Sequence, residues 1–390
     1  MFILNVALLL YSYVTTLTHT HITTLKEEMI TVNGKFGVLM HISNVTSTLF
    51  FQIELQLPFS YVSSNVINRA RLTHAMSCSY GDVVIDNVTT SYEELSDSVQ
   101  LYRNSHVIMN QFDFYYLNNN SNALYKYNGV SLSIMSLQQG NSIINYLYNN
   151  HYIHTKQFHL CGEAIYFGNI DHTCIDSKYK ATLISNGDVA YWSSLVYCVD
   201  VNGNVVYANE NGSVVYFKGN DYAISVPKRV YDIIERDVLN EFVEMKMCNV
   251  GFDVKEMRKF YSCAKSVREK MKGIKFGIGG YWFDVGSKEL FWEEGSEIFQ
   301  RFVIVENVNE SDMSFTMGTQ FLKQYVISFE YNNNNGDESK HNLIHFYSEH
   351  QFDQCNNNNS KSTLKYHLII TICILLLINL LLMLIVKVIV

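Results

Sequence analysis

The sequence predicts a chain built mostly from β-strands with a few short helices, lying between a signal peptide and a C-terminal membrane anchor. Three observations carry this expectation: apolar runs at both ends of the chain, strand-like runs rich in Val, Ile, Tyr and Phe between them, and a composition that is 48% apolar. With 390 residues, the chain can form one large domain or two lobes and bury a sizeable core. Its mild net charge of -8 argues against a nucleic-acid partner.

The N-terminal segment, residues 1–20, is expected to be a signal peptide. Residues 1–17 are largely apolar and form too short a run for a comfortable bilayer span. The segment lacks Lys and Arg at its start, and the alternative is a buried N-terminal strand. A signal peptide would direct the chain into the secretory pathway.

The C-terminal segment, residues 367–387, is expected to be a transmembrane helix. The run from 368 to 386 is aliphatic except for Asn379, and Lys365 and Lys387 flank it. About 20 such residues cross a bilayer core, and a helix that is apolar all round rarely serves a soluble domain. The sequence therefore predicts a membrane-embedded chain.

A GPI signal is the alternative interpretation of this end of the chain. Small and polar residues near Asn358 to Ser360, a polar spacer and a hydrophobic tail fit such a signal. We favour the spanning helix, because Lys387 is awkward in a GPI tail. Residues 351–366 then form a polar stalk, and the chain is a single-pass type I protein of the cell surface or endomembranes.

Sequons and cysteines both support luminal exposure of the region between the two terminal segments. N-x-S/T sequons are acceptors for glycosylation, and cysteines in an oxidising compartment form disulfides. The odd number of cysteines before the anchor leaves one thiol free or intermolecular. No CxxC or HExxH motif occurs, so we expect no metal and no cofactor. The sequons are Asn44, Asn87, Asn119, Asn211, Asn309 and Asn358, and the cysteines are Cys78, Cys161, Cys174, Cys198, Cys248, Cys263 and Cys355.

The region between the terminal segments is predicted to be mostly strands. Its apolar and β-branched runs are separated by clusters of Gly, Asn and Ser. Asn202-Gly203 and Asn211-Gly212 each predict a hairpin, because type I′ turns need positive φ at both central residues. The expected strands are residues 36–42, 49–57, 130–134, 195–201, 205–207, 214–217 and 324–329.

Three helices are expected among these strands. The first covers Ser142 to Asn149, and Pro227 opens the second, since proline suits the first helical turn. An amphipathic pattern from Met257 to Met271 predicts the third. The basic polar face of that third helix is interpreted as a solvated face rather than a binding patch.

Several motifs in order along the chain, from residues 36–42 to residues 344–346, resemble the pepsin-like aspartic proteases (peptidase family A1). Those of the C-terminal half are similar to the family's LGGID…SYYTG hairpin, its YWQITLDSITMDG stretch, its LGDVFLRQYYTVFD segment and its last VGLA-type strand. Those of the N-terminal half are similar to its YYGTISIG opening and its FDGILGLG turn with the short helix that follows. The corresponding residues are 167–179, 191–203, 317–330 and 344–346, then 36–42 and 127–130 with 143–146.

This resemblance implies a bilobal pepsin-like double β-barrel, with an N-terminal lobe over residues 21–160 and a C-terminal lobe over residues 161–350. In this family each lobe contributes one Asp from a D-T/S-G-T/S loop, and the two carboxylates share a proton and activate a water. Counting from the first strand puts Glu54 at the first of these positions. The Thr-Gly that should follow has become Leu55-Gln56.

The second loop is also degenerate by this comparison. Alignment on Gly219 puts Phe217 where the Asp belongs, and alignment on Pro227 puts Lys218 there. Neither can act as the base of a carboxylate dyad, and Asp221 is the only nearby acid. Ser79-Tyr80-Gly81 resembles the family's flap, so Tyr80 and Gly81 are flap candidates, although the glycine-rich sequence that should follow is missing.

These observations favour a membrane-anchored, catalytically inactive pepsin-like homologue that binds a peptide or protein in its inter-lobe cleft. The first alternative is an active aspartic-type endopeptidase with a rearranged dyad, such as Glu54 with Asp221. The second alternative is an unrelated β-rich surface glycoprotein for adhesion or receptor binding. The sequence leaves enzymatic activity open and assigns no confident catalytic residue.

Overall fold

The structure is a computed structural model in which both expected terminal segments, residues 1–20 and 367–387, lie outside the described residues. Within the described part of the chain, no helix is long and apolar enough to cross a membrane. Of the expected stalk, only residues 351–355 are described. The structure describes residues 24–42, 48–55, 59–72, 74–85, 88–101, 108–117, 130–133, 142–176, 178–185, 192–254, 258–293, 299–309, 311–331 and 341–355.

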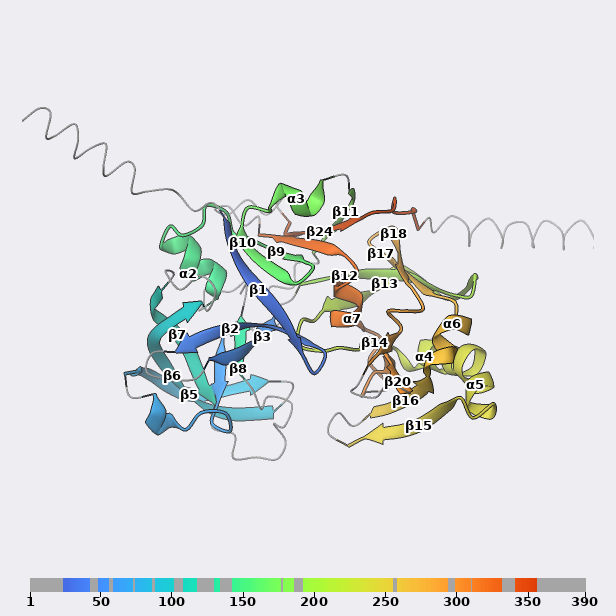
Figure 1. The fold of residues 1–390 in the computed structure, drawn as a ribbon, viewed down its shortest axis with the longest axis horizontal. Helices are drawn as coiled ribbons and strands as arrows, with labels where there is room; N and C mark the ends of the chain where they lie inside the picture. Colours follow the sequence, from blue (N-terminus) through green and yellow to red (C-terminus); the bar gives the residue numbers. More distant parts are fainter. Residues whose placement is uncertain are drawn as a thin grey trace, which may run out of the picture.

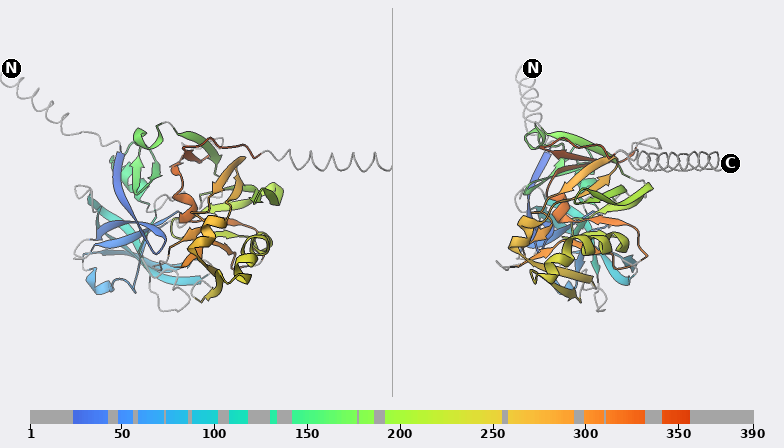
Figure 2. Two further views of the ribbon diagram at one scale, coloured as in Figure 1. Left: turned by 45° about the vertical axis from the view of Figure 1, so that its right-hand side comes forward. Right: turned by 90° about the vertical axis from the view of Figure 1, so that its right-hand side faces the viewer.

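Six antiparallel strands form a sheet that joins two lobes, with strand order β11-β24-β23-β9-β10-β1. This sheet lies at the top of Figure 1, and the two lobes lie side by side beneath it there and in the left view of Figure 2. Its strands come from both sides of residue 160, the predicted boundary between lobes. They are β1 (Thr24–Val32), β9 (Gln157–Cys161), β10 (Ala164–Gly168), β11 (Tyr179–Ile184), β23 (Val326–Glu330) and β24 (Leu343–Ser348).

The N-terminal lobe continues this sheet, because β1 pairs with β10 through its first half and with β2 through its second. The helix at Ser142 forms as predicted, with the Ser142 side chain capping its first turn. The elements of this lobe are β2 (Lys35–Ile42), β3 (Leu49–Glu54), β4 (Tyr61–Ser63), η1 (Arg69–Arg71), β5 (Met76–Ile85), β6 (Val88–Leu101), β7 (Ile108–Leu117), β8 (Val130–Ser133) and α2 (Ile143–Asn149).

The C-terminal lobe contains two further sheets among the described strands, with the orders β18-β17-β12-β13-β22-β14-β21 and β15-β16-β20-β19. Three of its helices, α4, α5 and α6, lie on the right of Figure 1. The strands are β12 (Ser193–Val201), β13 (Asn204–Phe217), β14 (Ile224–Val226), β15 (Cys248–Asp253), β16 (Arg258–Ala264), β17 (Ile274–Ile278), β18 (Tyr281–Val285), β19 (Phe291–Trp292), β20 (Phe299–Phe302), β21 (Ile304–Glu306) and β22 (Phe315–Met317). The helices are α3 (His172–Ile175), α4 (Lys228–Ile234), the π-helical turn η3 (Glu235–Leu239), α5 (Asn240–Glu244), α6 (Lys265–Lys270) and α7 (Thr319–Leu322).

One of the two predicted hairpins is confirmed and the other is wrong. Asn202 and Gly203 have φ values of 56° and 85° and join β12 to β13 in antiparallel register. At Asn211-Gly212, by contrast, β13 does not reverse but bulges between two stretches of the same ladder. The side chain of Asn209 stabilises the bulge by donating to the carbonyl oxygen of Gly212.

The predicted third helix, from Met257 to Met271, is also wrong over its first half. Residues Arg258 to Ala264 form β16, which pairs with β15 on one side and β20 on the other, and only Lys265–Lys270 is helical. A disulfide joins Cys248 to Cys263 across the β15–β16 ladder. Tertiary pairing therefore overrides a helical pattern in this segment. The second predicted helix begins after Pro227, as expected.

The predicted large core is confirmed, and aromatic side chains connect it beneath the joining sheet. Phe158 and Phe329, on neighbouring strands, stack with ring centroids 4.5 Å apart, and Trp192 meets Phe329 edge to face at 5.1 Å. All three side chains are fully buried. The joining sheet and the start of β12 thus share one apolar interior.

Candidate functional site

Each lobe contains a loop at which three strands meet in the same way. In the N-terminal lobe, β3 runs parallel to β8, and β4 runs antiparallel to β8 on its other side. In the C-terminal lobe, β13 runs parallel to β22, and β14 runs antiparallel to β22. The loops between β3 and β4 and between β13 and β14 are therefore structural counterparts.

The strand register shows which residues of the two loops correspond. Gln52 of β3 lies opposite Ser131 of β8, which also pairs with the first residue of β4. Phe217 of β13 lies opposite Met317 of β22, which also pairs with the first residue of β14. Gln52 and Phe217 are thus equivalent. Counting two residues further from each of them makes Glu54 equivalent to Gly219.

Glu54 and Gly219 approach each other where the two lobes meet. A Cβ on Gly219 would lie 2.9 Å from the carbonyl oxygen of Ile53, so only glycine fits this close approach of the two loops. Glu54 is 2% exposed, and its Oε2 accepts a hydrogen bond of 2.5 Å from the Nδ2 of Asn220. The backbone N–H of Phe36 also donates to the Gly219 carbonyl oxygen, at 2.9 Å. The loops of the two lobes are therefore joined through a carboxylate and a carboxamide.

The two residues that sequence comparison placed at the second catalytic position lie just before this point. Phe217 is fully buried, and its ring packs against Phe321 and Phe346 at centroid distances of 6.5 and 5.6 Å. Lys218 is half-buried, and its backbone N–H donates to the carbonyl oxygen of Met317. The register assigns the position equivalent to Glu54 to Gly219 instead, because the second loop is shorter than the first.

Asp221 is held by groups of its own lobe. Its Oδ1 lies 3.3 Å from the NH2 nitrogen of Arg258 and accepts the backbone N–H of Ala223 at 3.0 Å. Burial opposes ionisation of this carboxyl, but the positive charge of Arg258 and the Ala223 N–H outweigh it and lower the pKa of Asp221 below its usual value. Arg258 is 8% exposed and also lies over the Tyr222 ring. Asp221 is thus an ionised partner for a buried arginine.

Comparison with known proteins identifies this arrangement. A family model described as "Eukaryotic aspartyl protease" matches residues 76–337, which is more than half of the chain. The chain belongs to the eukaryotic aspartyl protease family. Its fold is similar to the crystal structure of an aspartic proteinase from Irpex lacteus, with a TM-score of 0.62 over 83% of this chain and 97% of that chain. The identity is 10%, so this likeness concerns the fold alone, and no curated protein matches the chain.

Aspartyl protease chemistry sets a clear requirement for the two loops. Two carboxylates must share one proton, so that one acts as base toward water while the other acts as acid. Here the amide of Asn220 reaches Glu54 from the opposite loop. An amide N–H donates a hydrogen bond but does not exchange the proton that the dyad needs. Sequence reasoning found Glu54 and missed Asn220, whose signal was a polar side chain directly after the glycine of the shortened loop.

The flap candidates lie in the middle of a strand rather than at a turn. Tyr80 and Gly81 belong to β5, where they pair with Glu93 and Tyr92 of β6. Tyr80 is 74% exposed, and its hydroxyl donates to Glu93, which also forms an ion pair of 2.8 Å with Arg69. The β5–β6 hairpin therefore turns several residues beyond the Tyr-Gly that resembles the aspartyl protease flap.

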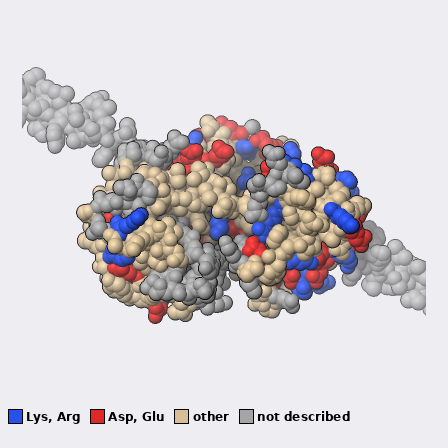
Figure 3. Space-filling view, turned by 60° about the horizontal axis from the view of Figure 1, so that its bottom comes forward, with Lys and Arg blue, Asp and Glu red and all other residues tan. Residues whose placement is uncertain are grey.

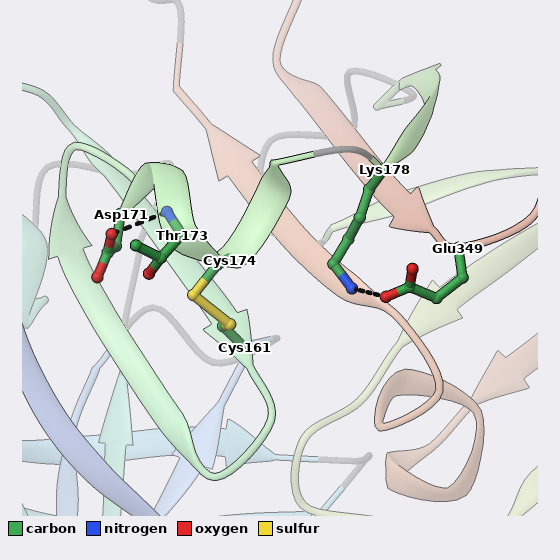
Figure 4. The surroundings of a disulfide bond; sticks show 6 residues. All are labelled: Cys161, Asp171, Thr173, Cys174, Lys178 and Glu349. Carbon is green, nitrogen blue, oxygen red and sulfur yellow. Dashed lines mark hydrogen bonds and ion pairs between the residues drawn. A yellow bond between two sulfur atoms is a disulfide. The ribbon is translucent and has the colours of Figure 1, made fainter.

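The predicted disulfides are confirmed, and they pair six of the seven cysteines that precede residue 367. Figure 4 shows Cys161–Cys174, which fastens the short helix α3 to β9 beside the capping contact of Asp171 with the backbone N–H of Thr173. Cys78 is the free, exposed thiol in the described part of the chain, as the odd number predicted. These bonds support passage through an oxidising compartment. The pairs are Cys161–Cys174, Cys198–Cys355 and Cys248–Cys263.

The described sequons are exposed, as glycosylation would require. Asn211 and Asn309 lie at the surface, and Asn309 Oδ1 accepts a hydrogen bond from the Ser311 hydroxyl of the same sequon. Asn44, Asn87, Asn119 and Asn358 lie outside the described residues. No cluster of metal-binding side chains occurs among the residues that the structure describes. In the space-filling view, charged side chains gather over the C-terminal lobe and its border with the N-terminal lobe (Figure 3).

Proposed function

We propose that this chain is a membrane-anchored member of the aspartyl protease family that lacks protease activity and binds an extended peptide or protein segment between its lobes. The observation that carries this proposal is the hydrogen bond between Glu54 and Asn220 at the meeting point of the two loops. Gly219 stands at the position equivalent to Glu54, and the carboxamide of the next residue, Asn220, reaches Glu54 where the family's chemistry needs a second carboxylate. Binding would take place on the luminal or extracellular side.

The charges around the loops support inactivity. Glu54 accepts a hydrogen bond from the amide of Asn220, and an amide supplies no acid proton that the two groups could share. Asp221, the other acid near the second loop, is committed to Arg258. Binding does not depend on the dyad, since extended peptides are held chiefly by backbone hydrogen bonds and by pockets for alternate side chains.

Cleavage assays on the full-length chain in detergent micelles test the proposal. A library of quenched fluorescent peptides, incubated between pH 3 and 7 with and without pepstatin, should show no pepstatin-sensitive cleavage. Peptides recovered on the immobilised chain should include extended binders, and an excess of free peptide should displace them. Glu54→Gln, which keeps the side-chain shape, serves as the matched control. Pepstatin-sensitive cleavage that is lost in both Glu54→Gln and Asp221→Asn would instead establish the rearranged dyad.

The anchor is tested separately. The full-length chain should remain in the membrane pellet after alkaline carbonate extraction, and a chain that ends at residue 366 should be secreted. Release of the full-length chain by a phosphatidylinositol-specific phospholipase would replace the spanning helix with a lipid anchor.

A further inference from the structure

Among the strands that the structure describes, β15 is an edge strand, and it exposes apolar side chains. It stands at the end of the four-stranded sheet of the C-terminal lobe, at the lower right of Figure 1. Val250 and Phe252 are two residues apart and therefore share one face of the strand, and they are 51% and 57% exposed. Val254, directly after the strand, is 75% exposed. An exposed apolar edge of this kind is a template for pairing with another strand.

This edge lacks the features with which proteins usually block such pairing. β15 contains no Lys and no Pro, and its ladder with β16 shows no register shift. Its one charged residue, Asp253, forms an ion pair of 3.0 Å with Arg301 of the same sheet. The disulfide between Cys248 and Cys263 fixes the first residue of β15 to its neighbour. A strand held in this way loses little conformational freedom when it pairs.

The surrounding sequence is also free of glycosylation signals. The chain contains no N-x-S/T sequon between Asn211 and Asn309, and β15 lies within this interval. Sequons occur on both sides of the interval along the chain. A bulky glycan attached within this part of the C-terminal lobe is therefore not expected.

We propose that β15 pairs antiparallel with β15 of a second copy of this chain, about a twofold axis at Gly251. In this register, Val250 lies opposite Phe252 of the second copy, and Asn249 lies opposite its Asp253. Apolar side chains meet apolar ones, and the only charged residue faces an amide rather than its own counterpart. Such self-complementarity is what an isologous contact requires, and it favours a second copy over an unrelated peptide.

Disulfide trapping in the membrane of expressing cells tests the register. On a Cys78→Ser background, full-length Val250→Cys and Phe252→Cys chains carrying different tags should form a mixed disulfide dimer when co-expressed. Each variant expressed alone should form several-fold less. Gly251 is unsuitable for trapping, because a Cβ there would lie 2.4 Å from the Phe260 ring. Val205→Cys, at a similarly exposed valine on β13, is the matched control and should not form a dimer.

Charge replacement provides an independent test. Phe252→Asp should weaken self-association of the full-length chain in micelles about tenfold, since two apolar cross-strand pairs are lost in each dimer. Adding Val250→Lys to Phe252→Asp should restore it, because each new lysine then faces a new aspartate. Absence of the mixed disulfide, an equally strong disulfide from Val250→Cys alone, or failure of the double variant to restore association would overturn the proposal. Trapping of a different protein instead of a second copy would also overturn it.

Discussion

Acidification should destabilise this protein through His159, which lies in the middle of the sheet that joins the lobes. Its side chain is fully buried, and its Nε2 lies 2.8 Å from the carbonyl oxygen of Gly168. Burial penalises the imidazolium and, with His345 nearby, lowers the pKa of His159 to about 4, although the Gly168 carbonyl and Glu330 oppose this. Ser328 of β23 pairs with His159 on one side and with His345 of β24 on the other. Burial also lowers the pKa of His345.

The sign and size of the effect follow from linkage. An unfolded histidine has a pKa of about 6.5, so between about pH 6.5 and 4 the unfolded chain binds a proton that folded His159 does not. Stability is therefore fully present above pH 6.5 and declines as pH falls toward 4. The difference of about 2.5 pH units corresponds to a loss of about 3 kcal/mol.

Urea unfolding of the full-length chain in micelles, followed by tryptophan fluorescence from pH 7.5 to 4, measures this loss. The free energy of unfolding should fall with a slope of up to about 1.4 kcal/mol per pH unit from this residue. His159→Gln, which retains an N–H donor and does not titrate, should flatten the profile by about that amount, while exposed His350→Gln should leave it unchanged. An identical pH profile in the wild type and His159→Gln would refute the reasoning.

Three further perturbations test the core and the loops. Phe217→Ala should lower the free energy of unfolding by about 3–5 kcal/mol in urea titrations, because it empties a fully buried site; a loss below 1 kcal/mol would place the ring outside the core. Asn220→Asp should lower the melting temperature at pH 7 but much less at pH 4, because a second carboxylate beside Glu54 has a raised pKa and is tolerated only when protonated. A pH-independent loss would contradict that reasoning. Thr319→Val should cost about 1–2 kcal/mol by removing the hydrogen bond to the Gly34 carbonyl oxygen, as thermal unfolding can show, whereas no change would mean that water replaces it.

Much of the fold was predictable, because its signals are local or recur in a fixed order. The turn at Asn202-Gly203 needs only two residues that tolerate positive φ, and the structure has both there. The pair at Asn211-Gly212 carries the same signal, yet the ladder around it continues and the side chain of Asn209 closes the bulge. Whether such a pair reverses the chain depends on what the flanking residues pair with.

The candidate site was predictable in one lobe and not in the other. Glu54 is the last residue of β3, and a count without a gap from Ile42 leads to it. In the second lobe the loop between the strands is two residues shorter, since Gln52 and Tyr61 correspond to Phe217 and Ile224. Alignment on single motif residues cannot locate such a deletion, whereas the strand register can.

The absence of a carboxylate at Gly219, with the amide of Asn220 reaching Glu54 instead, also changes what the fold must tolerate at neutral pH. Two buried carboxylates at this point would repel unless they shared a proton, which ties the stability of an aspartyl protease dyad to acid conditions. A carboxylate that accepts an amide N–H has no such conflict, and the hydrogen bond joins the two loops at any pH at which Glu54 is ionised. The arrangement thus favours a fixed contact between the lobes. Such a contact agrees with the proposed role of holding a ligand between the lobes rather than moving a proton there.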